Sequence, residues 1–197
     1  MDSFHSHIWS SKKALVISDQ LIFSGNSFLL TILMARILTP EKFGLFASII
    51  LGIYLIISVL NALIIQPFQV MVAKINDIQS YTSFSFFYQV TSLSCVLLIV
   101  GFSPFLNLEF LINFTDLISP ITLFSFGFVM QDYFRKLFLA KSKIPQTIIL
   151  DGLTALLQTS ILLSGLFWFT FSLEIIIVLL GCAYIPSLII GIWFLQP

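Results

Sequence analysis

The stretch FGLFASIILGIYLIISVLNALII, residues 43–65, contains no charged side chain. A helix needs about 20 mostly apolar residues to cross the hydrocarbon core of a bilayer, so this stretch is long enough to do so. Within lipid a segment must satisfy its own backbone hydrogen bonds. A run of this length without alternating polarity is therefore expected to be a helix. This segment predicts that the chain crosses a membrane.

Five further stretches share this length and apolar character, and the short separators between them hold most of the charge. The six stretches are residues 14–35, 43–65, 81–103, 117–140, 146–169 and 173–195. We predict an all-α fold, a polytopic membrane bundle of six transmembrane helices. No linker or low-complexity tract divides the chain, so residues 1–197 are expected to form a single six-helix lobe.

The composition of the whole chain agrees with this prediction. Hydrophobic residues make up 58% and charged residues 9% of the 197 residues, and the mean hydropathy is +1.07. A soluble domain carries about 25% charged residues, so this chain could not cover a globular surface. Nine basic residues are balanced by nine acidic ones, which excludes binding of nucleic acid by a basic face. The apolar content excludes disorder.

Motifs of enzymes and metal sites are absent from the sequence. No glycine-rich phosphate loop and no acid-rich magnesium motif occurs, and His5 and His7 are expected to be solvated. Cys95 and Cys182 lie in apolar runs, which predicts small buried side chains instead of a disulfide or metal pair. We predict that the chain is not an enzyme and has no cofactor. An enzyme acting within the membrane is an alternative with no motif in its favour.

Basic residues are concentrated in alternate connections between the predicted helices. Four of the nine lie between residues 135 and 143. The charged residues in or next to the third and fifth connections are Glu109, Asp116 and Glu174, all of them acidic. Short loops rich in Lys and Arg remain in the cytoplasm. With an even number of spans, both termini are then cytoplasmic and the protein belongs to the cell (inner) membrane. Arg36 and Lys42, in the first outer connection, are exceptions.

Three of the six predicted helices carry polar side chains at helical spacing. Those we single out are Asp19, Gln20 and Asn26 in the first helix, Asn61 in the second, and Asp151 and Gln158 in the fifth. Polar groups inside a span usually face the bundle interior or a water-filled cavity. Taken jointly, the stripes predict a shared hydrated cavity. For each residue alone, an interhelical hydrogen bond worth about 0.6 kcal/mol is the alternative.

Charged residues near the ends of the spans allow two interpretations each. Asp19 and Asp151 are expected to pair with a cation such as Lys12 or Arg135, or else to carry a proton or sodium ion or form a gate. Asp132 and Arg135 are three residues apart, a spacing that favours a pair within one helix. Arg135, or Arg36 at the outer side, would alternatively contact a phosphate, which a guanidinium matches in geometry.

Small residues at four-residue spacing predict close helix packing in two places. They are Ala183, Ser187 and Gly191 in the last helix, and Ser48 with Gly52 in the second.

Residues 35–44 and residues 134–140 resemble stretches of the polysaccharide flippases, which belong to the multidrug/oligosaccharidyl-lipid/polysaccharide exporter superfamily. The first follows residues 23–27 and has the pattern Ala-Arg-x-Leu, a small residue, Pro, Glu and an aromatic–Gly pair. The matching residues are Ala35, Arg36, Leu38, Pro40, Glu41, Phe43 and Gly44, and Thr39 stands where the family often has Gly. The second is residues 134–140, similar to the family's junction between the fourth and fifth helices.

The resemblance implies export of a polyprenyl-pyrophosphate-linked oligosaccharide across the membrane by alternating access. Family members have two six-helix lobes around a central cavity, and 197 residues suffice for the first lobe alone. We therefore expect membrane lipid and the lipid-linked oligosaccharide as partners, with a second lobe or a homodimer to complete the cavity. The alternatives are a drug or small-molecule exporter of the same superfamily, and a non-transporting structural or assembly protein or truncated fragment.

Overall fold

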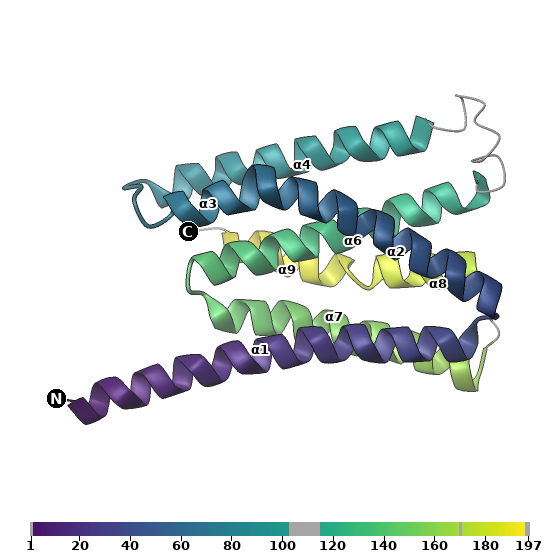
Figure 1. Cartoon of the computed structure of the whole chain (residues 1–197), viewed down its shortest axis with the longest axis horizontal. Coiled ribbons are helices and arrows are strands. Elements are labelled where there is room, and N and C mark those ends of the chain that lie inside the picture. Colours follow the sequence, from purple (N-terminus) through teal and green to yellow (C-terminus); the bar gives the residue numbers. More distant parts are fainter. Residues whose placement is uncertain (1, 103–114, 170, 196–197) are drawn as a thin grey trace.

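The computed structural model describes residues 2–102, 115–169 and 171–195, and the described chain is helical (Figure 1). The helices are α1 (Asp2–Ile37), α2 (Pro40–Leu60), η1 (Asn61–Ile65), α3 (Gln66–Met71), α4 (Ile78–Phe102), α6 (Thr115–Ala140), α7 (Ile144–Phe167), α8 (Leu173–Cys182) and α9 (Ile185–Leu195). Segment α2–η1–α3 is continuous, and α8 and α9 form one interrupted rod. The all-α prediction is confirmed.

Five helical segments of the described chain are long and apolar enough to cross a membrane. They are Lys13–Ile37, Pro40–Met71, Ile78–Phe102, Ile144–Phe167 and Leu173–Leu195. Five such helices indicate a protein that crosses the membrane several times. Helix α6 has 26 residues, about 39 Å at 1.5 Å per residue, but is more polar than these five. Its polar side chains are largely buried within the bundle, so their presence is compatible with the predicted sixth span.

Helix α6 lies at the centre of the bundle and contacts α2, α4, α7, α8 and α9. Helix α1 packs along α7 and touches α2 only slightly (Figure 1). The outward faces of the surrounding helices carry large exposed apolar side chains, for example Leu55, Phe87 and Leu156. The inward faces meet around aromatic residues such as Phe124 and Phe134, which are fully buried. Apolar side chains therefore occur both in the interior and on the outer surface, and such an outer surface suits contact with lipid.

The second predicted helix ends later than the sequence suggests. The predicted spans leave residues 66–80 as a connection, but the helix continues to Met71. A π-helical turn, Asn61–Ile65, precedes the proline, and the N–H of Gln66 bonds to the carbonyl of Asn61. Widening the turn accommodates a ring that would otherwise clash with the carbonyl four residues back.

The last predicted helix is broken where the sequence suggests one continuous span. Helix α8 ends at Cys182 and α9 begins at Ile185. Pro186 has no N–H to donate to the carbonyl of Cys182, and this loss explains the break. Helix α1, in contrast, is longer than the predicted span. It begins at Asp2 instead of near residue 14, so its 36 residues extend about 54 Å, beyond a hydrocarbon core of about 30 Å.

The small-residue predictions have mixed outcomes. Ala183, Ser187 and Gly191 are buried, and a Cβ on Gly191 would lie 2.8 Å from the Phe134 ring, so close packing is confirmed there. Ser48 and Gly52 are exposed, and that prediction is wrong for the described chain. Cys95 and Cys182 are also exposed, not buried. In a membrane protein, small apolar groups suit the lipid-facing surface as well as the interior.

Candidate functional site

A cavity of about 320 Å³ lies between α1, α2, α6 and α7, and the junction of α8 and α9 forms part of its wall. Its polar lining comes from Asn26, Gln131, Asp151, Thr154 and Gln158, together with exposed hydroxyls of α1. Its apolar lining is mainly aromatic. The aromatic residues are Phe23, Phe46, Tyr54, Phe124, Phe128 and Tyr184. The cavity thus combines several amides with flat apolar walls, the composition typical of a small-molecule site.

Hydrogen bonds across the cavity join helices far apart in the sequence. Asn26 Nδ2 donates to Gln158 Oε1 at 2.9 Å, linking α1 to α7. The hydroxyls of Thr154 and Ser187 lie 2.6 Å apart and link α7 to α9. Gln131 Oε1 and Asn26 Oδ1 are buried and accept no hydrogen bond from any described residue. Burying an unsatisfied polar atom costs about 1–3 kcal/mol, so these two oxygens favour a hydrated or ligand-binding interior.

A buried ion-pair network closes one end of this cavity. The Arg135 guanidinium contacts Asp19 Oδ2 through Nη2 and Asp151 Oδ2 through Nε, both at 2.9 Å. Gln20 Oε1 accepts from the same Nη2 at 3.1 Å. The side chains of Arg135, Asp19 and Asp151 are 9%, 2% and 2% exposed. Helices α1, α6 and α7 are therefore joined by one arginine between two carboxylates.

Two further contacts hold this network in place. Gln131 Nε2 donates to Asp151 Oδ1 at 2.9 Å, so Asp151 is engaged on both oxygens. The guanidinium carbon of Arg135 lies 4.0 Å from the centre of the Phe23 ring, a cation–π contact. With two carboxylates for one guanidinium, the three ionised groups sum to one negative charge. Such a network is strongly destabilised when its cation is removed.

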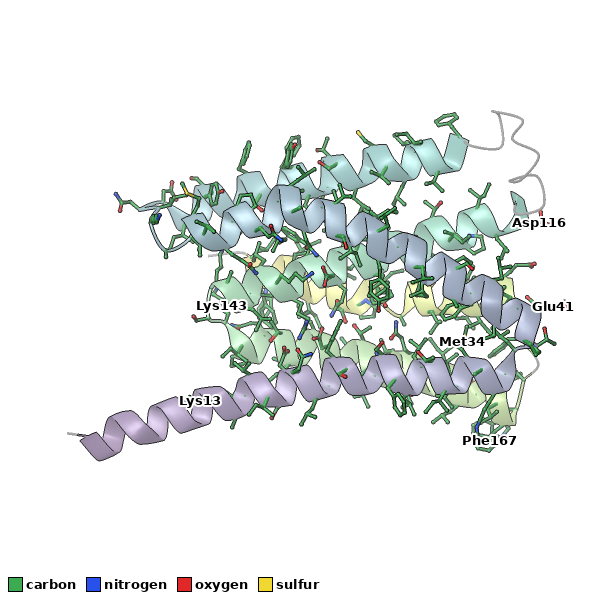
Figure 2. All side chains as sticks on the ribbon, in the orientation of Figure 1. Lys13, Met34, Glu41, Asp116, Lys143 and Phe167 are labelled. Atoms are coloured by element: carbon green, nitrogen blue, oxygen red, sulfur yellow. The ribbon has the colours of Figure 1, made fainter. Side chains whose placement is uncertain are left out.

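The position of the network defines which end of the cavity is closed. Asp19 precedes the cavity-lining part of α1, which begins at Phe23, and Arg135 follows the lining part of α6. The network consequently lies between the cavity and the end of the bundle that holds the start of α1 and the α6–α7 turn. That end carries Lys13 and Lys143, and Glu41 and Asp116 lie at the other (Figure 2).

The expected pair between Asp132 and Arg135 does not form. Asp132 Oδ2 pairs with Lys136 Nζ at 2.6 Å, one helical turn away, and Asn61 Nδ2 approaches the same oxygen at 3.4 Å. Arg135 instead turns toward α1 and α7, where the two aspartates compensate its charge. The pairing of Asp19 and Asp151 with Arg135 is one of the two interpretations predicted for them.

The two candidate phosphate contacts lie far apart. Arg36 is exposed at the end of α1, 17 residues after Asp19, which is about 26 Å along the helix. Arg135 is buried against two carboxylates. A single phosphate cannot contact both in this conformation. A phosphate role for either one stays a prediction.

The six predicted cavity residues divide into three that line the cavity and three, Asp19, Gln20 and Asn61, that do not line it. Asn26, Asp151 and Gln158 line the cavity, Asp19 and Gln20 contact Arg135, and Asn61 reaches Asp132, which also lines it. Sequence reasoning did not single out Gln131, Phe23 or Tyr184. Gln131, a lone amide within an apolar stretch, is the one that carried a usable signal. Groups of His, Cys, Asp or Glu that could hold a metal do not occur among the described residues.

Comparison with known protein families, with curated proteins and with solved structures finds no match for this chain. What the chain shows is a helical protein with five candidate membrane spans and a cavity of mixed polar and aromatic lining between its helices.

Proposed function

We propose that this chain is one lobe of a membrane exporter that moves a polar head group through its bundle by alternating access, with a lipid-linked oligosaccharide as substrate. The cavity between α1, α2, α6 and α7 is the observation that carries this proposal. Buried amides with unsatisfied oxygens inside a membrane bundle are costly unless water or a ligand meets them. The nature of the substrate rests on the flippase-like stretches of the sequence.

The volume of the cavity bears on the size of the substrate. At about 320 Å³ it is at the low end of the 300–1,000 Å³ typical of small-molecule sites. One sugar or one phosphate group fits such a space, and a chain of several sugars needs more room. For the oligosaccharide, a second lobe or a second copy must therefore enlarge the cavity on the side where α1 and α2 barely meet.

A small-molecule exporter is the second candidate, and the same volume favours it. The aromatic walls formed by Phe23, Phe46, Tyr54 and Phe128 suit a flat or cationic ligand, since aromatic faces attract cations. Such a substrate would not require a larger cavity. The two candidates thus differ in whether the cavity of this chain is sufficient by itself.

The ion-pair network supplies a closed state for either substrate. Arg135 links α1, α6 and α7 at the end that the distribution of basic residues places in the cytoplasm. Passage through this end requires α1 to separate from α7, which breaks the contacts of Arg135. We therefore infer that the described conformation is closed at the cytoplasmic end.

Transport by the full chain in liposomes tests the proposal. We would measure the flux of a fluorescent lipid-linked oligosaccharide and of a cationic dye, for the natural chain and for Asn26→Leu. This substitution removes the hydrogen bond to Gln158 and places an apolar group in the cavity. The cavity then lacks one group that could hydrogen-bond the polar head group on its way through. One such hydrogen bond is worth about 1.4 kcal/mol, so we expect flux to fall about tenfold.

The matched control is Phe28→Leu, on the lipid-facing side of the same helix, where Phe28 is 68% exposed. Flux of the oligosaccharide that falls in Asn26→Leu and not in the control supports the flippase. Flux of the dye alone supports the small-molecule exporter. Equal flux in both variants removes the cavity as the route, and absence of flux for both substrates rejects transport by this chain.

A further inference from the structure

A second cavity lies outside the helix bundle, at the end that holds the α6–α7 turn. It is a groove of about 550 Å³ between the end of α3, the first turns of α4, the α6–α7 turn and the end of α9. The first cavity and this groove have no lining residue in common. The groove plays no part in the proposed transport route.

The lining of the groove is divided into a polar and an apolar part. Lys141, Lys143 and Ser142 come from the turn, and Gln79 and Ser83 from α4. Apolar walls are supplied mainly by Ile78, Phe86 and Leu195. No acidic residue is among the described residues that line it. The groove therefore offers two positive charges and several hydrogen-bonding groups next to apolar surface.

The turn that carries the two lysines is fixed by backbone hydrogen bonds. Ser142 has a positive φ of 58°, and the N–H of Lys143 donates to the carbonyl of Phe138 at 2.8 Å. The N–H of Ser142 donates to the carbonyl of Leu139 at 3.0 Å. A residue in the left-handed conformation with such hydrogen bonds is a common way to end a helix, and it fixes the backbone of the turn. Both lysine backbones are thus held at defined positions on one side of the groove.

The two ammonium groups are close enough to influence each other. Partial burial, and secondly the charge of Lys143, lower the pKa of Lys141 from its ordinary value. Lys141 is half-buried, so its charge is incompletely hydrated. A bound anion would relieve both the repulsion and the lost hydration.

Asp77, the acidic residue just before α4, does not line the groove. Asp77 is exposed immediately before α4, and its Oδ1 accepts the N–H of Ser80 at 3.0 Å. It caps the helix and lies outside the residues that line the groove. Among the residues that the structure describes, no carboxylate lines the groove beside Lys141 and Lys143.

We propose that this groove binds the phosphodiester head group of an anionic phospholipid. The turn between α6 and α7 lies at the end of a membrane-spanning segment, which is the level of lipid head groups. Basic pockets between transmembrane helices recognise such head groups. The apolar walls contact the start of the acyl chains, a contact that inorganic phosphate cannot make.

Binding to the full chain in detergent micelles tests this proposal, with fluorescent phosphatidylglycerol and phosphatidylcholine as probes. We expect phosphatidylglycerol to bind about 30-fold more tightly, because each basic residue near an anionic lipid contributes about fivefold. The double variant Lys141→Gln/Lys143→Gln is expected to lose this preference, and Lys141→Arg/Lys143→Arg to retain it.

The matched control is Arg36→Gln/Lys42→Gln, which removes the same charge at the opposite end of the bundle. An equal loss in this control would show attraction by net charge alone and overturn the proposal. Equal affinity for the two lipids would also overturn it. Displacement of the lipid by millimolar inorganic phosphate would show that the groove binds a phosphate anion without contacting the acyl chains. That result would overturn the proposal that its ligand is a phospholipid.

Discussion

Replacing Arg135 with methionine tests whether the ion-pair network is destabilised more by loss of its cation than by loss of one of its two carboxylates. The variant has an unbranched side chain of similar volume but no cation, so the buried carboxylates of Asp19 and Asp151 lose their partner. Removal of one partner from a buried ion pair costs about 3–5 kcal/mol. Here two carboxylates lose the same partner and also repel each other, so we expect a loss in the upper half of that range.

Replacing either aspartate with asparagine should have a much smaller effect. The network has two carboxylates for one guanidinium, and Asp19→Asn leaves Arg135 paired one-to-one with Asp151. The amide still presents an oxygen to Nη2. We expect a loss of about 1 kcal/mol, the net value of one hydrogen bond. The triple variant Asp19→Asn/Arg135→Met/Asp151→Asn removes every charge of the network, and should recover at least half of the stability lost by Arg135→Met alone.

Unfolding by SDS titration measures these differences. Cys95 and Cys182 are exposed on α4 and α8, so donor and acceptor dyes attached to them report the separation of these helices by energy transfer. The free energy of unfolding is extrapolated to zero SDS for each variant. Two results would refute the reasoning: a loss in Asp19→Asn equal to that in Arg135→Met, or a triple variant no more stable than Arg135→Met.

Two further predictions concern packing and capping. A Cβ on Gly127 would lie 2.7 Å from Cβ of Tyr184, which cannot move as a side-chain tip can, so Gly127→Ala should destabilise the bundle by about 1–3 kcal/mol in the same titration. Gly52→Ala is the control, because nothing lies within 4 Å of its Cβ position, and it should cost nothing. Asp77→Ala should speed amide exchange in the first turn of α4, and Asp77→Asn should not. Because hydrogen bonds from Ser80 lower the pKa of Asp77 below its ordinary value of 3.8, its cap is present above that pH and is lost as the pH falls below it. The measured quantity is the protection factor, the intrinsic exchange rate at each pH divided by the observed rate. A protection factor for that turn that is the same at pH 6 and pH 2 would contradict this interpretation.

Five of the six predicted spans coincide with helices long and apolar enough to cross a membrane, because length and apolar content are properties of the sequence alone. The ends of the helices were harder to predict from the sequence, because proline has different effects in different surroundings. Pro67 follows a π-helical turn and does not end its helix, whereas Pro186 interrupts the last rod. A proline signals a missing hydrogen bond, and neighbouring turns decide whether the helix widens or breaks.

The polar residues of α1 and α7 were predictable from helical spacing, but the role of α6 was not. Asp132 has a cation at i+3, Arg135, and another at i+4, Lys136, and sequence spacing does not distinguish between them. The pairing is decided by tertiary structure. Asp19 and Asp151, from two other helices, are in contact with Arg135, and Asp132 is left to Lys136.

The ion-pair network also provides a test between the transporting and the non-transporting interpretations of this bundle. Opening the cavity at the network requires the contacts of Arg135 with both aspartates to break, and leaving a buried charge unpaired costs several kcal/mol. A transporter must offset that cost in its other state with a bound cation, a proton or a second lobe. A static structural protein has no such need. Asp19→Asn reduces the cost of opening while leaving the bundle paired, so it should raise the flux of a transporter whose slow step is opening. In a structural protein it would change stability only.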